Sequence, residues 1–431
     1  MANRVDSIAP RSAQADPPAI HESGFTRMFG ALQQSPYYRT YWFGNQASTL
    51  MMMMQGVAQG YLAYTLTNSA AALGFVGLAQ GLPQLLLAPV GGVVADRYAK
   101  RNVLIVVQVV LCLSSLAIGI LISLNLIAYW HLVVTGCIQG GCFAFLMPTR
   151  QSWIPSLVSK EDLPNAIALN NAGLNASRIM GPAIGGLLIA VPWIGVNGIY
   201  YMRVAAFAWV LYSLLQIPIL GIADSKHVRK FRDELTAGLR FIYAHETLLP
   251  LFTLALVTLL LGSSYQMLLP AFALATFGLQ SEGLGFMMAA VGIGALCGSL
   301  SMAYFSGSKH KGRIQAIAGV SLGVSLLLFG FVSGLHLYGA ALVTLFFVGL
   351  SNDFYSTINN TLIMLNTDKA LYGRVMSVYM MTWSLAPLSA APFGLLMDKI
   401  GAPPTMIIIG GVLALFVLGM AQFHPGYRRI P

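Results

Sequence analysis

Long apolar runs of about 20 residues recur along this chain and constrain its fold more than any other feature. A helix needs roughly 20 apolar residues to cross the ~30 Å hydrocarbon core of a bilayer. Twelve such runs nearly fill the 431 residues, so the predicted fold class is all-α, an integral membrane protein without a sizeable soluble domain. The expected spans are 41–64, 71–95, 102–125, 130–150, 166–191, 198–220, 248–270, 283–305, 314–333, 338–362, 374–397 and 403–423.

Composition supports lipid as the main solvent of this chain. Only 9% of its residues are charged, whereas soluble domains carry about 25%. The net charge of +10 fits basic loops at a membrane surface better than a nucleic-acid site, so we expect membrane lipid as a partner and no nucleic acid.

Motifs for catalysis and cofactors are lacking in the sequence. The four cysteines lie inside apolar runs and form no C-x-x-C pair, so no metal site is expected. Gly319–Gly323 matches the G-x-S-x-G hydrolase pattern, but it lies within an apolar span rather than at a strand end. No phosphate-binding loop occurs either. We predict no catalytic residues, no cofactor and no ATP; an ion gradient would supply the energy.

One polar stretch, at 224–246, divides the chain into two groups of six spans. The predicted organisation is an N-terminal tail (1–38), an N-terminal bundle (39–221), a central loop (222–246), a C-terminal bundle (247–423) and a C-terminal tail (424–431). Nothing in this layout requires more than a monomer.

The distribution of positive charge predicts the orientation. With the N-terminus placed in the cytoplasm, 21 of the 24 Lys and Arg fall on the cytoplasmic side. The exceptions are Arg178 in span 5, Arg203 near the outer end of span 6, and Lys399 outside. This asymmetry predicts a multi-pass protein of the cytoplasmic (inner) membrane with both termini in the cytoplasm.

The two halves also resemble each other. An ungapped alignment of residues 74–101 with residues 285–312 places Gly74 on Gly285, Gly81 on Gly292 and Lys100 on Lys311. Pseudo-symmetric halves packed around a central site are a recurring plan of transporters.

The sharpest motif lies between spans 2 and 3, and it resembles the loop signature of the major facilitator superfamily, G-x-x-x-D-R/K-x-G-R-R/K. Five residues match that signature: Gly92, Asp96, Arg97, Lys100 and Arg101. Ala99 stands where the family has Gly. The resemblance implies two six-helix bundles around a central cavity, and a cytoplasmic gate in which Asp96 faces the start of span 11, near 373–375.

A second motif, in span 5, resembles the antiporter signature of the same family, g-x-x-x-G-P-x-x-G-G. Its residues here are Gly181, Pro182, Gly185 and Gly186, and they favour close helix packing. Span 4 departs from the proton-linked members, because Gly136 stands where they often have Arg.

Further segments, including Pro148-Thr149-Arg150 and Gly373-Arg374-Val375, resemble the drug-exporter branch that includes macrolide and siderophore efflux proteins. The resemblance implies proton-coupled efflux of a small amphipathic molecule, a drug or a siderophore-like compound. Two alternatives remain open: an uptake symporter for a metabolite or lysolipid, and a non-transporting membrane sensor or scaffold.

Polar residues within the spans are the candidate coupling and cavity residues. A charge at the bilayer centre costs about 2.5–3.5 kcal/mol, so such groups face protein or a water-filled cavity. Asp353 in span 10 is either a coupling site or a structural anchor, and Arg178 either pairs with it, binds an anionic ligand, or, as we favour, pairs within the N-terminal half. The remaining candidates are Asn352, Thr357, Asn360, Asn45, Gln46, Gln55 and Gln59.

Overall fold

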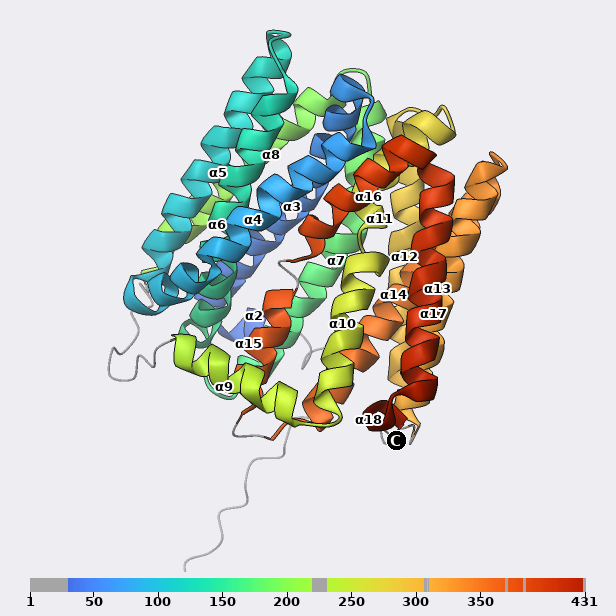
Figure 1. Cartoon of the computed structure of the whole chain (residues 1–431). Coiled ribbons are helices and arrows are strands. Elements are labelled where there is room, and N and C mark those ends of the chain that lie inside the picture. Colours follow the sequence, from blue (N-terminus) through green and yellow to red (C-terminus); the bar gives the residue numbers. More distant parts are fainter. Residues whose placement is uncertain are drawn as a thin grey trace, which may run out of the picture.

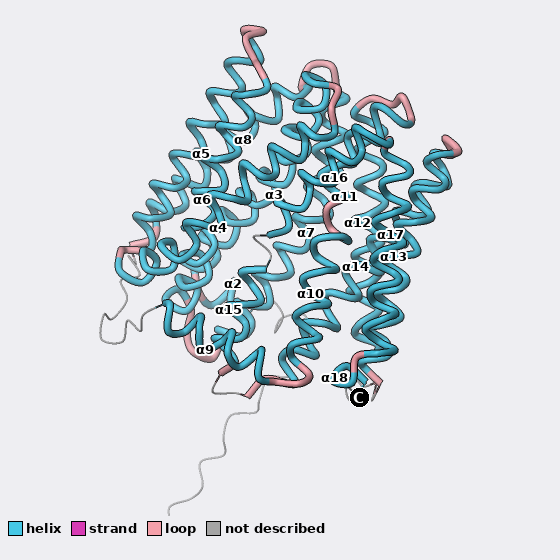
Figure 2. The backbone as a smooth tube through the Cα atoms, in the orientation of Figure 1, coloured by secondary structure: helices cyan, strands magenta, loops and turns pink. Residues whose placement is uncertain are grey.

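The computed structural model describes residues 30–218, 231–305, 308, 310–368, 371–382 and 385–428, and this part of the chain is helical apart from short turns (Figures 1 and 2). In order, the helices are α2 (Gly30–Gln34), α3 (Pro36–Thr67), α4 (Ala70–Arg97), α5 (Lys100–Ser123), α6 (Tyr129–Leu157), α7 (Leu163–Ala190), α8 (Gly195–Gln216), α9 (Phe231–Ala244), α10 (Leu248–Gly262), α11 (Tyr265–Ala271), η2 (Phe272–Thr276, a π-helix), α12 (Ser281–Phe305), α13 (Lys311–Gly334), α14 (Tyr338–Leu365), α15 (Tyr372–Thr382), α16 (Ala386–Ile400), α17 (Ala402–Phe423) and α18 (Pro425–Arg428).

Each of the twelve expected spans coincides with one of these helices or with a broken helix. Nine helical segments of the described chain are long and apolar enough on their own to cross a membrane. The other three are α3, α7 and the pair α15–α16. Amides lie in both α3 and α7, and α7 also carries Arg178; a helix can carry such groups only where protein or water meets them.

Span 7 is interrupted, which the apolar pattern does not reveal: it runs as α10, α11 and the π-helical η2. Span 11 is described as α15 and α16, and residues 383–384 between them lie outside the described chain.

Figure 1 shows the N-terminal helices (blue to green) and the C-terminal helices (yellow to red) as two groups side by side, with α9 crossing beneath them. The end of the bundle that carries the basic loop after α4 also holds α9 and α18; it is called the basic end below, and the other the opposite end.

Glycines that align between the two halves form the two seams between them. A Cβ at Gly74 of α4 would overlap the backbone of Ala391 in α16, and a Cβ at Gly285 of α12 would press on the backbone of Gly186 in α7. Because α4 and α12 occupy corresponding places in the two halves, these seams agree with the pseudo-symmetry seen in the sequence.

The N-terminal half begins earlier than expected, because α2 and the first turn of α3 are packed into it rather than into a tail. Tyr38 is fully buried and donates its hydroxyl hydrogen bond to the Ala166 carbonyl (2.6 Å). Ser35 caps α3 by accepting from the Tyr38 N–H, and its hydroxyl donates to the Leu157 carbonyl (2.7 Å). The preceding residues, 1–29, lie outside the described chain.

A candidate transport site between the two halves

Two opposite charges face each other across the space between the halves. Arg178 projects from α7 in the N-terminal half and interacts electrostatically with Asp353 of α14 in the C-terminal half. Arg178 is exposed, as are Asn171 and Asn175, which lie two turns and one turn before it on the same face of α7. Of the partners left open by the sequence, Asp353 of the other half is therefore one with which Arg178 interacts.

The polar stripe on α14 surrounds Asp353. Thr357 donates a hydrogen bond to the Asp353 backbone carbonyl (2.9 Å), so this hydroxyl is satisfied within its own helix. The Oδ1 atom of Asn360 is buried and has no hydrogen-bond partner among the described residues. A buried amide oxygen without a donor is costly, which makes Asn360 a candidate to accept from a ligand or water.

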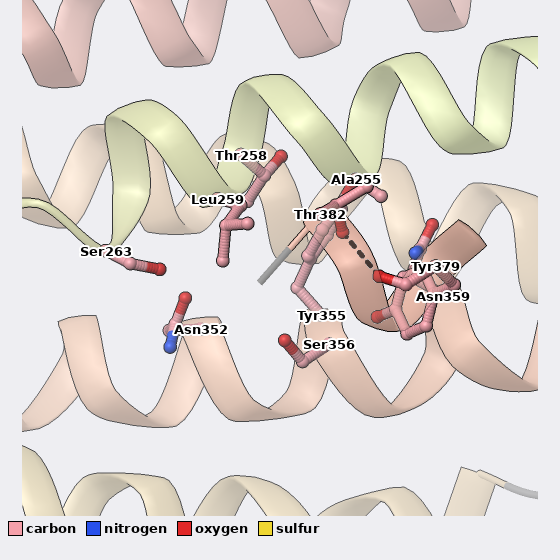
Figure 3. A pocket seen from close by; sticks show the side chains of 10 residues that line it. All are labelled: Ala255, Thr258, Leu259, Ser263, Asn352, Tyr355, Ser356, Asn359, Tyr379 and Thr382. Carbon is pink, nitrogen blue, oxygen red and sulfur yellow. Dashed lines mark hydrogen bonds between the residues drawn. The ribbon is translucent and has the colours of Figure 1, made fainter. Parts of the chain in front are cut away.

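A small recess, partly open to solvent, lies beside this stripe within the C-terminal half (Figure 3). Its wall combines hydroxyl and amide groups with apolar side chains, and none of its residues is charged. The lining residues are Ala255, Thr258, Leu259, Ser263, Asn352, Tyr355, Ser356, Asn359, Tyr379 and Thr382. Such a mixed wall suits a ligand with both polar and apolar parts.

The C-terminal helix α18 is tied to this recess by hydrogen bonds. The buried hydroxyl of Tyr427 donates to the Gly312 carbonyl (2.8 Å) and lies 3.2 Å from Gln315 Oε1. Gln315 Nε2 in turn donates to Oδ1 of Asn359 in the recess wall (2.6 Å). Residues 425–428 therefore belong to the bundle, although 424–431 was expected to be a tail.

Tyr427→Phe removes the hydroxyl from this chain, and we expect it to lower the free energy of unfolding by about 1–2 kcal/mol, because buried acceptors lose their donor. Thermal unfolding of the detergent-solubilised protein would measure the change. Tyr243→Phe is the matched control because Tyr243 is 71% exposed, and it should leave the midpoint unchanged. Equal midpoints for both variants would contradict the tether.

Most of the span-1 amides lie inside the N-terminal half rather than between the halves. Gln55 accepts from Arg203 and from the Ser115 hydroxyl (3.1 Å), and Gln59 donates to the Leu132 carbonyl (3.2 Å). Asn45 donates to Oδ1 of Asn170 on α7 (3.0 Å).

Gln46, the remaining span-1 amide, packs closely against Gly173 of α7. A Cβ added to Gly173 would overlap the Gln46 side chain. Its two amide atoms are buried and lack hydrogen-bond partners among the described residues. Gln46 is therefore the span-1 residue best suited to meet a ligand or water.

Sequence reasoning missed two buried arginines in the N-terminal half. Arg150, counted among the cytoplasmic charges at the end of span 4, lies inside α6 and donates to Ser48 (2.9 Å) and Thr49 (3.3 Å). Arg203, expected near an outer end, lies inside α8 against Gln55. Among the described residues neither guanidinium has a carboxylate partner, so neutral oxygens replace the water that would otherwise solvate the two charges.

Among the described residues, the signature loop at the basic end makes no hydrogen bond with span 11. Asp96 is exposed, and among the described residues it accepts no hydrogen bond from the first turn of α15; its charged neighbour is Lys100. Arg97 is exposed as well, and Arg101 donates to the Ile217 carbonyl at the end of α8 (2.9 Å). The close helix contact is made by Gly91, which packs on Ala144, whereas a Cβ on Gly92 would meet nothing within 4 Å.

The span-5 motif provides close packing, as expected. Gly181 and Gly185 lie against Met53 and Met54 of α3, and Gly186 lies against Gly285 of the other half. Pro182 sits inside α7, which continues through it to Ala190. Together with the α4–α16 seam, this packing closes the opposite end of the bundle, whereas the Asp96 loop leaves the basic end unlatched.

The family model for transmembrane secretion effectors matches residues 27–425, which is nearly the whole chain. The chain belongs to this family of major facilitator transporters. The assignment makes it a membrane transporter and not an enzyme, as the sequence indicated.

Relatives of this secretion effector include the enterobactin exporter EntS of Escherichia coli O1:K1, which is 25% identical over 91% of this chain and 94% of the relative. The EntS protein of Shigella boydii serotype 18 matches to the same extent.

Solved transporter structures share the fold. The nucleoside transporter NupG superposes with a TM-score of 0.70 at 12% identity, over 90% of this chain and 99% of its own. A D-xylose–proton symporter superposes with a TM-score of 0.68 at 14% identity, over 91% and 99% of the two chains. At such low identity these likenesses establish the major facilitator fold alone.

Proposed function

We propose that this secretion effector exports amphipathic small molecules across the cytoplasmic membrane in exchange for protons, by alternating access. The basic end would face the cytoplasm, because the loops after α4, α6 and α12 carry Lys and Arg there. Both termini would lie on that side, and a monomer would suffice, because the site lies within one chain.

The nature of the site supports a small organic substrate. Exposed amides lie on α7, and the C-terminal half holds the uncharged, partly apolar recess of Figure 3. Since EntS is an exporter, export is the direction that the relatives support. Siderophore-like compounds and hydrophobic drugs both combine polar and apolar surface and are the classes to test first; ATP and cofactors have no place in this scheme.

The observation that carries the coupling proposal is the Arg178–Asp353 pair between the halves. Each charge is expensive within a membrane unless it is paired or hydrated. With Asp353 ionised, its attraction to Arg178 links α14 to α7; a proton on Asp353 removes that attraction and lets the halves move apart at this point. Proton binding and the conformational equilibrium are thereby coupled.

Asp353→Asn is expected to abolish substrate-induced proton release while leaving the protein folded. Everted membrane vesicles with an acid interior and a pH-sensitive dye would report that release when siderophores and drugs are added one at a time. Asp368→Asn is the control, because Asp368 is an exposed acid in the loop after α14.

Proton release that is lost with Asp353→Asn and kept with Asp368→Asn would support the proposal. Equal release from all three proteins would show that Asp353 is structural and that protons take another route. If a compound is moved but never releases protons in the wild type, the coupling ion is not the proton.

A further inference from the structure

The seam at the opposite end is joined by a carboxylate as well as by packing. Asp398, in the last turn of α16, accepts hydrogen bonds from the Ser69 hydroxyl (2.5 Å) and from the backbone N–H groups of Ala70 (2.7 Å) and Ala71 (3.1 Å). These donors form the first turn of α4. A side chain of the C-terminal half thus caps a helix of the N-terminal half.

The turn that precedes α4 prepares this contact. Asn68 adopts a left-handed conformation (φ 50°), so the chain reverses between α3 and α4 within two residues. Ser69 then caps α4 itself by accepting from the Ala72 N–H (3.3 Å). Of the first three N–H groups of α4, one is therefore satisfied within the half and two depend on Asp398.

The first and last turns of span 2 and span 11 are arranged reciprocally. The last turn of α4 carries Asp96 and lies at the basic end, where α15 begins. The last turn of α16 carries Asp398 and lies at the opposite end, where α4 begins. Each span therefore carries an acid in its last turn, at the end of the bundle where the other span begins. An acid is stabilised at a helix N-terminus by the N–H groups and the helix dipole.

We propose that Asp398 is a latch for the opposite end of the bundle, the counterpart of the gate that the family resemblance assigns to Asp96, and that only one of the two is closed at a time. In this structure the Asp398 latch is closed and Asp96 is exposed. Opening the opposite end breaks the three bonds to Asp398, and closure at the basic end brings Asp96 to the first turn of α15. Naming the sides as outer and cytoplasmic rests on the proposed function.

The exposure of Asp398 suits a reversible latch better than a permanent structural bond. Water can replace the carboxylate at the N–H groups of Ala70 and Ala71 when the seam opens, and it can solvate the carboxylate. Tight packing of Gly394 on Ala70 and of Gly74 on Ala391 already holds the closed seam. The contribution of Asp398 is therefore a bias between the two states.

Distances between spin labels on the two halves test the proposal in detergent or nanodiscs without substrate. The labels would be placed in a background free of the four native cysteines. Leu126→Cys with Leu337→Cys reports on the opposite end, because both residues lie in loops there and are 62% and 51% exposed. Glu161→Cys with Asp368→Cys reports on the basic end, where both are exposed.

Asp398→Asn should raise the ratio of open to closed populations at the opposite end by roughly two- to fivefold, the effect of removing a charge from a helix N-terminus. Asp96→Asn should lower this ratio of open to closed populations, and the double variant should return it toward the wild-type value. Lys399→Gln, beside Asp398 and exposed, should change nothing.

The proposal is overturned if Asp398→Asn leaves both distance distributions as in the wild type, or if the two Asn variants shift them in the same direction. Should Asp398→Asn not yield monodisperse protein, Ser69→Ala, which removes one of the three donors, must give the same direction with a smaller shift. These distances are measured without substrate or proton gradient, so failure of the export proposal would leave this result intact. Failure of the latch proposal would likewise leave the export proposal intact.

Discussion

Gly74→Leu is expected to reduce transport by roughly 5- to 150-fold, because it places a side chain where the halves meet backbone to backbone. Gly74 has no room for even a Cβ against Ala390 and Ala391. Overpacking a close interface costs about 1–3 kcal/mol, and here this cost destabilises only the state in which the opposite end is closed. The variant should therefore fold, insert and remain open at that end.

Uptake of a fluorescent substrate into everted vesicles would measure this loss, and the spin-label pair at residues 126 and 337 would show the open end. Gly419→Leu is the control, since a Cβ at Gly419 of α17 meets nothing within 4 Å. Near-normal transport by Gly74→Leu would mean that the α4–α16 seam does not need to close during the cycle.

Gln55→Leu should lower the free energy of unfolding by about 3 kcal/mol, since it removes the acceptor from a buried guanidinium. Gln55 is 2% and Arg203 5% exposed, and the two are joined directly by a hydrogen bond. The loss would appear as a lower thermal midpoint in detergent. Gln59→Leu, one turn away, removes a bond to a neutral carbonyl and should cost only about 1 kcal/mol.

The double variant Gln55→Leu/Arg203→Met distinguishes a stranded charge from a simple packing defect. Replacing both partners by apolar groups of similar size can restore stability, because no charge remains to be solvated. We expect its midpoint to lie well above that of Gln55→Leu alone. A double variant less stable than either single one would show that Arg203 has another essential partner.

The arrangement of helices could be predicted from sequence because the bilayer imposes a length and a polarity on every span. The break in span 7 could not, since a helix end buried among other helices leaves little trace in hydropathy. The close seams were recognisable from glycines. Helix rotation decides which of two adjacent glycines makes the contact, and Gly91 rather than Gly92 packs on α6.

The candidate site was harder to predict, because a polar residue in a span can lie on any of several faces of its helix. Gln55 and Gln59 turn toward the core of their own half, whereas Arg178 and Asp353 turn toward each other. Arg150 was counted among the cytoplasmic charges at the end of span 4, although α6 continues to Leu157. The expected contact of Asp96 with span 11 is not made among the described residues, and the latch proposal assigns it to the other state of the cycle.

Accumulation of one substrate in everted vesicles, driven by an imposed pH gradient alone, tests the account most directly. Vesicles containing the wild type and acidified inside should concentrate the compound against its gradient, lose it when a protonophore is added, and fail to concentrate it with Asp353→Asn. Accumulation that ignores the pH gradient, or movement of the compound out of the vesicles instead, would contradict proton-coupled export.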